Sequence, residues 1–523
     1  MFKATEQKAT LVYPPHGIHY RFSSPDYFAL ALRHSQFPIY MGLVLPELAT
    51  SSGKMMKWMC LNLLLVLVLS GAAMSQNITT TLPGYPGTLP FSLETGYVGV
   101  GDLDELQFFY YFIESQRNPV RDPLLLWLTG GPGCSGFSGL VYEIGPLTFD
   151  YVAFNGSFPT FVDNPFSWTQ IASIIFLDAP VGTGFSYSTT QEGYNSSDTE
   201  SAEAVYQFLR KWLIKHPKFR YNPLYIAGDS YSGMIVPQVT LKVSDGNRNG
   251  IRPSMKLQGY LLGNPVTELH SDENSRIEFY HRVTLISSEL YASIRESCQG
   301  EYVNPNVSSS DCMDDIGLVA ECTIPVDDAN ILQPKCSWAS PKLADGSIKR
   351  GLKFFDDIPD EIIRSPTKRQ EHWCRNENYV LSYIWANDAT VQAALSIRNG
   401  TITDWKRCNK SLAYDSNLLS VVEYHRELLG RGYRSLIYSG DHDGLIPYVG
   451  TLTWIRSLNL TTADGWRPWY VNGNVAGFTE KYTNGVSDGL TFATLKGAGH
   501  TAPEYMPEQA LDMMDRWLAH YPL

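Results

Sequence analysis

The stretch YIAGDSYSG, residues 225–233, decides the fold. The apolar residues 224–227 predict a short buried strand, and the sequence from Tyr231 onward predicts a helix. Ser230 stands at the turn between them, among small residues. A strained strand-to-helix turn of this kind lifts a serine hydroxyl to the carboxyl edge of a parallel sheet. The stretch departs from the strict G-x-S-x-G pattern, because Ser232 replaces the second glycine and Gly233 follows it.

Strand and helix patterns alternate on both sides of this turn. We predict further strands at 107–113, 123–128, 172–177, 435–438 and 491–495, and helices at 421–429 and 507–520. The capping box Ser197-Asp-Thr-Glu200 starts another helix, which ends before Pro217. This alternation predicts an α/β-hydrolase fold, with a mainly parallel central sheet and helices on both faces.

The alternation stops between about residues 267 and 383, where five cysteines, scattered prolines and a charged stretch occur. We interpret residues 267–383 as an inserted lid domain that divides the hydrolase core into 76–266 and 384–523. Its charged part, 342–369, has paired basic residues suited to proteolysis. A long surface loop is the alternative interpretation of that part.

An apolar run near the start predicts a signal peptide at 55–75. Lysines precede the run at 63–69 and small residues follow it, although a buried core helix is the alternative. The run is too short for a stable membrane anchor. Residues 1–54 show no periodicity, and we interpret them as a non-native or disordered extension, with translation starting at Met55 or Met56.

Charge and acceptor sequences favour a protein of the secretory pathway, destined for a vacuole or the cell exterior. The net charge of -12 argues against binding to nucleic acid. Seven Asn-x-Ser/Thr sequences follow the predicted signal peptide and predict N-glycosylation. Their acceptor residues are Asn77, Asn155, Asn195, Asn306, Asn399, Asn409 and Asn459.

A serine nucleophile needs an imidazole to accept its proton. His500 follows the predicted strand 491–495 on a glycine loop and precedes the last helix. In this fold the acidic residue precedes the histidine, so we predict Asp441, directly after the strand 435–438, as the third member of the triad. Asp443 is the competing acid, and His442 is interpreted as a neighbour.

An oxyanion formed at Ser230 needs preorganised N–H donors. We predict the backbone amides of Tyr231 and of Gly131, in the GGPG loop after the strand 123–128. No cysteine lies in a CxxC pair or beside histidines at metal spacing, so we expect no metal and interpret the cysteines as disulfides.

With these motifs in place, the chain resembles the serine carboxypeptidase family, and more closely its plant serine carboxypeptidase-like acyltransferase branch. The resemblance extends from about Leu89 to the C-terminus. It is carried by LLLWLTGGPGCSG (124–136), IIFLDAPVGTGFSYS (174–188), YIAGDSYSG (225–233), LIYSGDHDGLIPYVGT (436–451) and GAGHTAPEYMP (497–507).

The resemblance implies an α/β-hydrolase core with an insertion, and a disulfide pattern. Carried onto this chain, the family's disulfides are Cys134–Cys408, Cys298–Cys312 and Cys336–Cys374, which leaves Cys322 as the odd thiol. Members of the acyltransferase branch are often cut into two linked polypeptides, and 342–369 is the corresponding linker here.

Two departures concern the family's site for a peptide's C-terminal carboxylate. Peptidase members usually have Asn before the Gly-Gly-Pro-Gly loop and Glu before the nucleophile, whereas this chain has Thr129, next to Gly130, and Asp229. Glu143 resembles a retained member of that carboxylate network. Thr lacks the amide donors of Asn, and Asp is one methylene shorter than Glu, so we expect weakened carboxylate recognition.

These departures favour an acyltransferase that takes an acyl group from a 1-O-acylglucose and passes it to an alcohol through an acyl-serine, without a cofactor. A serine carboxypeptidase that acts on peptide C-termini is the alternative. A non-catalytic binding protein on the same fold is a remote third possibility. The oligomeric state, the acyl group and the acceptor stay open.

Overall fold

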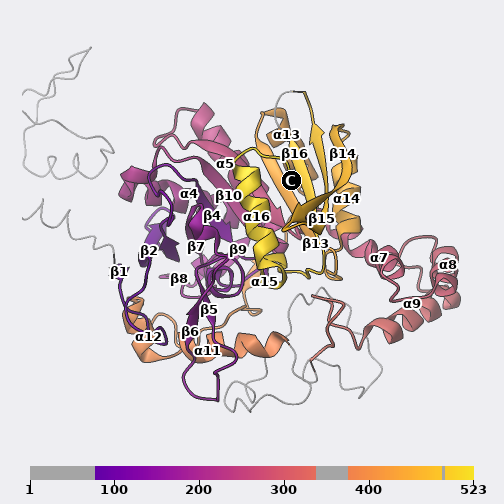
Figure 1. The fold of residues 1–523 in the computed structure, drawn as a ribbon, viewed down its shortest axis with the longest axis horizontal. Coiled ribbons are helices and arrows are strands. Elements are labelled where there is room, and N and C mark those ends of the chain that lie inside the picture. The colour runs from indigo at the N-terminus through magenta and orange to yellow at the C-terminus, as the bar shows by residue number, and fades with distance from the viewer. Residues whose placement is uncertain (1–76, 337–374, 486–488) are drawn as a thin grey trace, which may run out of the picture. The chain divides into compact units, whose positions relative to one another are not determined.

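The computed structural model describes residues 77–336, 375–485 and 489–523, which contain the predicted hydrolase core except residues 76 and 486–488 (Figure 1). The predicted extension 1–54, signal peptide 55–75 and linker 342–369 lie outside these ranges and stay predictions. Among the described residues, no helix has the length and apolar character needed to cross a membrane.

A twelve-stranded sheet forms the centre of the fold, in the order β1-β2-β3-β7-β4-β10-β11-β13-β16-β15-β14, with β8 paired to β3. The strands from β7 through β4, β10, β11 and β13 to β16 are parallel, and both flanks are antiparallel. The bounds are β1 (Asn77–Thr79), β2 (Leu93–Val100), β3 (Leu106–Ile113), β4 (Leu124–Leu128), β7 (Ser173–Leu177), β8 (Tyr187–Ser188), β10 (Leu224–Asp229), β11 (Leu257–Gly263), β13 (Arg434–Gly440), β14 (Thr461–Val471), β15 (Asn474–Thr483) and β16 (Leu490–Leu495).

Helices cover both faces of this sheet because its central strands are apolar on both sides. In β10, Leu224 and Ile226 belong to one apolar core, whereas Tyr225 and Ala227 belong to the other. The first core includes α4 (Asp198–Lys215), α5 (Val236–Arg248), α13 (Val422–Gly430) and α14 (Tyr448–Ser457). The second includes α11 (Val380–Ala386) and α16 (Pro507–Leu518), which crosses the sheet in Figure 1. The predicted α/β-hydrolase fold is confirmed.

Helix α4 begins where the capping box predicts. The Ser197 hydroxyl accepts a hydrogen bond from the Glu200 backbone N–H at 3.3 Å and donates one to the Glu200 carboxylate at 2.9 Å. The helix ends at Lys215, because Pro217 two residues later cannot continue the backbone hydrogen bonding.

Four helices follow β11 in the first part of the predicted insertion: α6 (Leu269–Asn274), α7 (Arg276–Arg282), α8 (Ser288–Ser297) and α9 (Ser310–Thr323). A small apolar core, to which Val449 of α14 also belongs, holds α7 to α9, and it contains the disulfide Cys298–Cys312. They lie to one side of the sheet, beyond α14 (Figure 1). This core and their position are consistent with the predicted lid.

The structure bears out much of the cysteine pattern. Cys134–Cys408 and Cys298–Cys312 are disulfides, and Cys322 is an exposed free thiol. Cys336 is also disulfide-bonded. Its predicted partner Cys374 lies outside the described residues, so that pairing stays a prediction.

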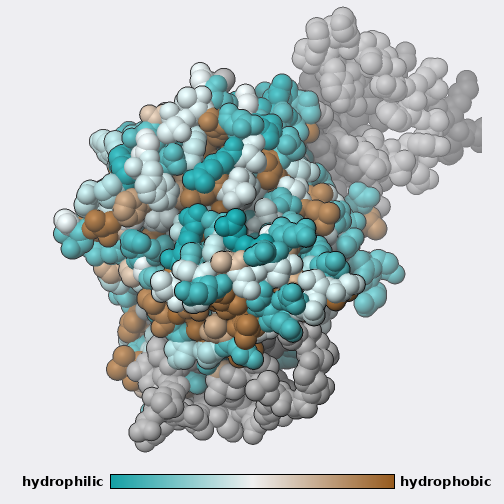
Figure 2. All heavy atoms as spheres, turned by 90° about the vertical axis from the view of Figure 1, so that its right-hand side faces the viewer, coloured by the Kyte–Doolittle hydropathy of each residue, from teal (hydrophilic) through white to brown (hydrophobic). Residues whose placement is uncertain are grey.

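The antiparallel hairpin of β14 and β15 was not predicted from the sequence. Its residues 461–471 contain Asp-Gly and a proline, and irregularities interrupt the strand register at several points. The sequence therefore lacks the regular alternation of apolar and polar residues that predicts a strand. The hairpin leaves Trp466, Tyr470 and Val475 partly exposed. On the face shown in Figure 2, apolar side chains occur in small groups between hydrophilic ones.

Candidate active site

Ser230 stands on a sharp turn between β10 and the short helix Ser230–Met234, as predicted. Its backbone φ is +55°, a conformation that non-glycine residues rarely adopt. The turn is possible because Gly228, before the serine, and Gly233, after it, have no side chains. A methyl group on Gly228 would lie 2.2 Å from the Ser232 hydroxyl, and one on Gly233 would lie 2.3 Å from the Val266 carbonyl oxygen. Ser232 fits in the turn, with its hydroxyl donating to the Asp229 carbonyl at 2.7 Å.

His500 lies against the serine. It follows β16, and its Nε2 is 2.7 Å from the Ser230 hydroxyl oxygen. The imidazole is buried, and its backbone N–H donates to the Ala329 carbonyl at 2.7 Å. An imidazole placed in this way can accept the serine proton as the hydroxyl oxygen attacks.

Asp443 is the acid that holds this imidazole. Its Oδ2 lies 2.8 Å from Nδ1 of His500 and accepts a second hydrogen bond from the Asn264 side-chain amide at 2.7 Å. Its Oδ1 accepts the backbone N–H groups of Leu445 at 2.8 Å and Ile446 at 3.3 Å. A carboxylate with this many donors is fixed in position, so it holds the proton on Nδ1 and leaves Nε2 facing the serine as a base.

The prediction that Asp441 completes the triad is wrong. Its carboxylate has other partners: it accepts from Lys496 Nζ at 2.7 Å and from the Gly497 backbone N–H at 2.8 Å. Pairing between β13 and the chain beyond β16 continues through this point, since the Asp441 N–H donates to Leu495 and the His442 N–H to Ala498. The turn toward the site therefore comes two residues later, at Asp443.

Asn264 is a residue of the site that sequence reasoning missed. It follows β11 at the same edge of the sheet, with φ +42°. Its amide nitrogen donates to Asp443, and its amide oxygen accepts from the Gly440 backbone N–H at 3.0 Å. The sequence does contain a signal for Asn264: a polar residue directly after a buried parallel strand lies at the sheet edge where functional groups of such folds occur.

The electrostatics of His500 reflect two opposing effects. Burial lowers the pKa of the imidazole, but the charge and hydrogen bond of Asp443, with a further contribution from Asp229, raise it by more. The net pKa of His500 therefore lies above its ordinary value of 6.5. The histidine becomes a competent base only when the pH exceeds this raised value.

The GGPG loop after β4 packs directly on the nucleophile turn. A methyl group on Gly130 would lie 2.5 Å from Ser230 Cβ and 2.7 Å from the Tyr231 nitrogen. The Gly130 N–H donates to Asp229 at 3.1 Å. Gly131, with φ +123°, has no acceptor for its N–H among the described residues. This setting supports the predicted oxyanion role of Gly131 and Tyr231, which stays a proposal.

Two buried carboxyl groups, Glu143 and Asp229, lie beneath this loop. Burial is the main cause that raises the pKa of Asp229 to about 6, although the charge of His500 and the Gly130 N–H oppose it. Burial, followed by the charges of Asp229 and Glu504, raises the pKa of Glu143 well above its usual range. Glu143 Oε2 has no hydrogen-bond partner among the described residues. The folded structure therefore favours the protonated form of Glu143.

Thr129 stands at the start of the loop, and its hydroxyl oxygen accepts from the Trp127 indole N–H at 3.2 Å. The hydroxyl keeps one proton to donate to a ligand, whereas an asparagine amide would offer two. The structure thus places Thr129, Gly130, Asp229 and Glu143 at the GGPG loop, and their predicted role in substrate binding stays a proposal. Among the described residues, no group of three or more His, Cys, Asp or Glu side chains is arranged to hold a metal ion.

Comparison with known proteins identifies the family. A family model described as serine carboxypeptidase matches residues 83–520. Serine carboxypeptidase-like 2 of Arabidopsis thaliana is 46% identical over 449 residues, which cover 86% of this chain and 94% of that protein. Serine carboxypeptidase-like 17 of the same plant is 44% identical over 459 residues, 88% of this chain and 97% of that protein.

A solved structure supports the fold. A prohormone-processing carboxypeptidase from Saccharomyces cerevisiae superposes with a TM-score of 0.63 at 17% identity, covering 82% of this chain and 92% of that one. Ser230 on the nucleophile turn, the buried His500 and the family match all indicate a serine nucleophile. The chain belongs to the serine carboxypeptidase family and is a serine-nucleophile enzyme of the α/β-hydrolase fold.

Proposed function

We propose that this enzyme transfers an acyl group from a 1-O-acylglucose to an alcohol acceptor, in the secretory pathway and in a vacuole or outside the cell. His500 takes the proton of Ser230, and the serine oxygen attacks the acyl carbon. The bond from that carbon to the glucose oxygen breaks, and glucose leaves with the proton from His500. The acceptor alcohol then gives its proton to His500 as its oxygen attacks the acyl carbon; the bond from that carbon to the serine oxygen breaks, and His500 returns the proton to Ser230.

The two N–H groups of Gly131 and Tyr231 stabilise the oxyanion that forms in both steps. Asp443, fixed by Asn264, holds the imidazole and balances its charge while it carries the proton. No step of this scheme requires a group that the chain itself does not supply.

One observation carries the preference for acyl transfer over peptide hydrolysis: the polar groups around the oxyanion loop are poor carboxylate donors. Thr129 offers one hydroxyl proton, and Asp229 uses its Oδ1 to accept from Gly130. An acylglucose has no carboxylate at the leaving group and loses nothing in such a site. A peptide's C-terminal carboxylate needs several donors to replace its hydration.

The second candidate, a serine carboxypeptidase, has an observation of its own. Glu143 is buried, and its raised pKa keeps it protonated at acidic pH, so that it can donate one hydrogen bond to a carboxylate. This donor favours residual peptidase activity, and its contribution to carboxylate binding grows as the pH falls.

Parallel assays separate the candidates. The purified enzyme is incubated with a 1-O-acylglucose and a panel of alcohols, and separately with a blocked dipeptide, with Ser230→Ala as the control. We expect acyl esters of at least one alcohol and slow release of amino acid. Release of C-terminal amino acids without ester transfer would favour the peptidase. A third possibility, a binding protein without activity, predicts no covalent labelling of Ser230 by an organophosphate.

A further inference from the structure

Asn409 differs from the other predicted glycan acceptors in what its side-chain nitrogen does. The acceptors with exposed side chains are Asn155, Asn195, Asn306, Asn399 and Asn459. In Asn155 and Asn306 the side-chain oxygen accepts a backbone N–H from the serine two residues on. Asn409 makes the same bond with Ser411, at 3.1 Å, but is half-buried. Among the described residues, it alone of these acceptors also donates a hydrogen bond through its amide nitrogen.

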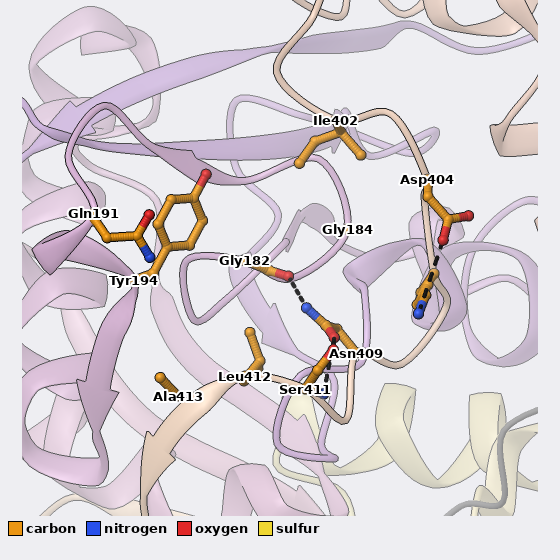
Figure 3. Close-up of a pocket in the computed structure, with 11 residues that line it drawn as sticks. Gly182, Gly184, Gln191, Tyr194, Ile402, Asp404, Asn409, Ser411, Leu412 and Ala413 are labelled. Carbon is orange, nitrogen blue, oxygen red and sulfur yellow. Dashed lines mark hydrogen bonds and ion pairs between the residues drawn. The ribbon is translucent and has the colours of Figure 1, made fainter.

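That donor bond joins two loops. The Asn409 side-chain nitrogen donates to the Gly182 carbonyl oxygen at 2.9 Å, and the side-chain oxygen accepts from the Ser411 hydroxyl at 2.8 Å (Figure 3). The carboxamide is therefore engaged at both ends. Gly182 belongs to the small-residue loop after β7, in which a methyl group on Gly182 would lie 2.7 Å from Leu412.

The backbone around Asn409 is tied to the GGPG loop at the nucleophile. The Asn409 N–H donates to the Gly133 carbonyl at 2.9 Å, and the Ser135 N–H donates to the Arg407 carbonyl at 2.7 Å. The disulfide Cys134–Cys408 lies between these two bonds. A methyl group on Gly133 would lie 2.7 Å from the Asn409 carbonyl oxygen, so the two segments are in close contact.

We propose that Asn409 is not a glycan acceptor but a positioning residue. Its carboxamide holds the Gly182 loop, while the backbone of residues 407–409 pairs with residues 133–135. Together these bonds keep the Gly131 N–H in place for the oxyanion. N-glycosylation would replace one hydrogen of the same nitrogen by a sugar carbon, on a half-buried carboxamide that is already bonded at both ends. The positioning part rests on the proposed oxyanion role of Gly131, whereas the unmodified state of Asn409 does not.

The alternative is that a sugar on Asn409 occupies the open pocket beside it. This pocket has a volume of about 500 Å³ and is bordered by Tyr194, Asp404, Lys406 and Ser411 (Figure 3). A glycan there would leave the side-chain nitrogen a single hydrogen, which would have to keep the bond to Gly182 while the sugar entered the pocket. Occupancy of the site by a sugar is therefore the outcome that contradicts the proposal.

Glycopeptide mapping of the enzyme secreted from a eukaryotic host tests the modification. We expect the peptide with Asn409 to be unmodified, and peptides with exposed acceptors such as Asn155 and Asn306 to carry glycans. A glycan on Asn409 in enzyme that labels with an organophosphate would overturn the proposal.

Three variants test the positioning role through the rate of organophosphate labelling per folded molecule, which depends on neither donor nor acceptor. Asn409→Asp removes the donor to Gly182, and we expect the rate to fall by about 10- to 100-fold. Asn399→Asp is the matched control, because it deletes an exposed acceptor that donates no hydrogen bond, and its rate should not change. Ser411→Ala removes the glycosylation sequence but keeps the carboxamide, and we expect a change of less than about threefold, since one neutral hydrogen bond is lost.

An Asn409→Asp enzyme with a lowered melting temperature but an unchanged labelling rate would reduce Asn409 to a structural role and contradict the proposal. Equal losses in Ser411→Ala and Asn409→Asp would point to a required glycan and contradict it as well. If Asn409→Asp is not secreted, Asn409→Ala places no charge beside the Gly182 carbonyl and serves for the same measurement. Failure of acyl transfer in the donor and acceptor assay would leave these labelling rates unaffected, so the two proposals fail separately.

Discussion

Asn264 and His500 share one carboxylate: the side-chain amide of Asn264 donates at 2.7 Å to the Asp443 oxygen that lies 2.8 Å from Nδ1 of His500. Asn264 comes from the end of β11, Asp443 from the loop after β13 and His500 from the loop after β16. Three neighbouring parallel strands thus fix the orientation of the imidazole that faces Ser230. Asp443 is thus held in place by Asn264, a residue outside the triad, and a substitution can test whether Asp443 is the acid.

Replacement of the acid is the first test. Asp443→Asn removes the charge that holds the protonated Nδ1, so we expect kcat/KM on a 1-O-acylglucose to fall by about 10⁴-fold. Asp441→Asn is the matched control, with an expected change within about threefold, because the Asp441 carboxylate bonds to Lys496 and Gly497, whereas Asp443 holds Nδ1 of His500. Steady-state kinetics, with the melting temperature as a check of folding, decide between them. The reverse order of effects would restore Asp441 to the triad.

Asp441 and Asp443 show which parts of the site can be predicted from the sequence and which cannot. The strands before Ser230, Asp443 and His500, the nucleophile turn and His500 itself follow from local patterns, since buried strands and glycine-rich turns are set by nearby residues. The choice between Asp441 and Asp443 depends on where pairing of β13 with the chain beyond β16 stops, which is a contact between segments far apart in sequence. The β14–β15 hairpin was missed for a related reason, because its irregular register is supported by partners rather than by its own alternation.

The pH dependence of kcat/KM tests how neighbouring charges raise the pKa of His500. The base must be neutral, so activity falls as the pH drops through the raised pKa of His500. The Asp229 carboxylate contributes to that raised pKa by favouring the imidazolium. Asp229→Asn removes this charge, and we expect the acid limb of the profile to move to lower pH.

Glu143→Gln serves as the control for this shift, since Glu143 is not among the main causes of the raised pKa of His500. Its acid limb should stay close to that of the wild type. An unchanged limb in Asp229→Asn would show that Asp229 does not act on the imidazole.

Thermal stability should depend on the protonation of Glu143. The pKa of this buried carboxyl is raised well above 4.5 in the folded state, so folding favours its protonated form. Its contribution to stability is complete below the unfolded pKa and is lost as the pH rises through the folded pKa. Glu143→Gln mimics the protonated form at every pH.

We therefore expect the melting temperature of Glu143→Gln to match that of the wild type near pH 4 and to exceed it progressively toward pH 7. Differential scanning fluorimetry across this range measures the difference. A constant difference between the two proteins at all pH values would mean that Glu143 does not titrate as its burial implies.

The donors at the oxyanion loop allow the reaction preference to be reversed. Thr129→Asn combined with Asp229→Glu supplies an amide with two N–H donors and a longer carboxyl group, which together suit a peptide's C-terminal carboxylate. One added hydrogen bond to a charged group is worth about 1.5–3 kcal/mol, so we expect kcat/KM for a blocked dipeptide to rise by about 10-fold or more. Transfer from the acylglucose should change less, because that donor presents no carboxylate.

Thr129→Val is the control for this gain, because it keeps the volume of Thr129 and adds no donor. It also leaves the Trp127 indole N–H without the acceptor that lies 3.2 Å away in the native enzyme. A gain in peptidase activity that also appeared in Thr129→Val would have to come from altered packing rather than from carboxylate recognition. A gain confined to the Asn and Glu variant would tie the choice between ester and peptide to the groups flanking the nucleophile turn.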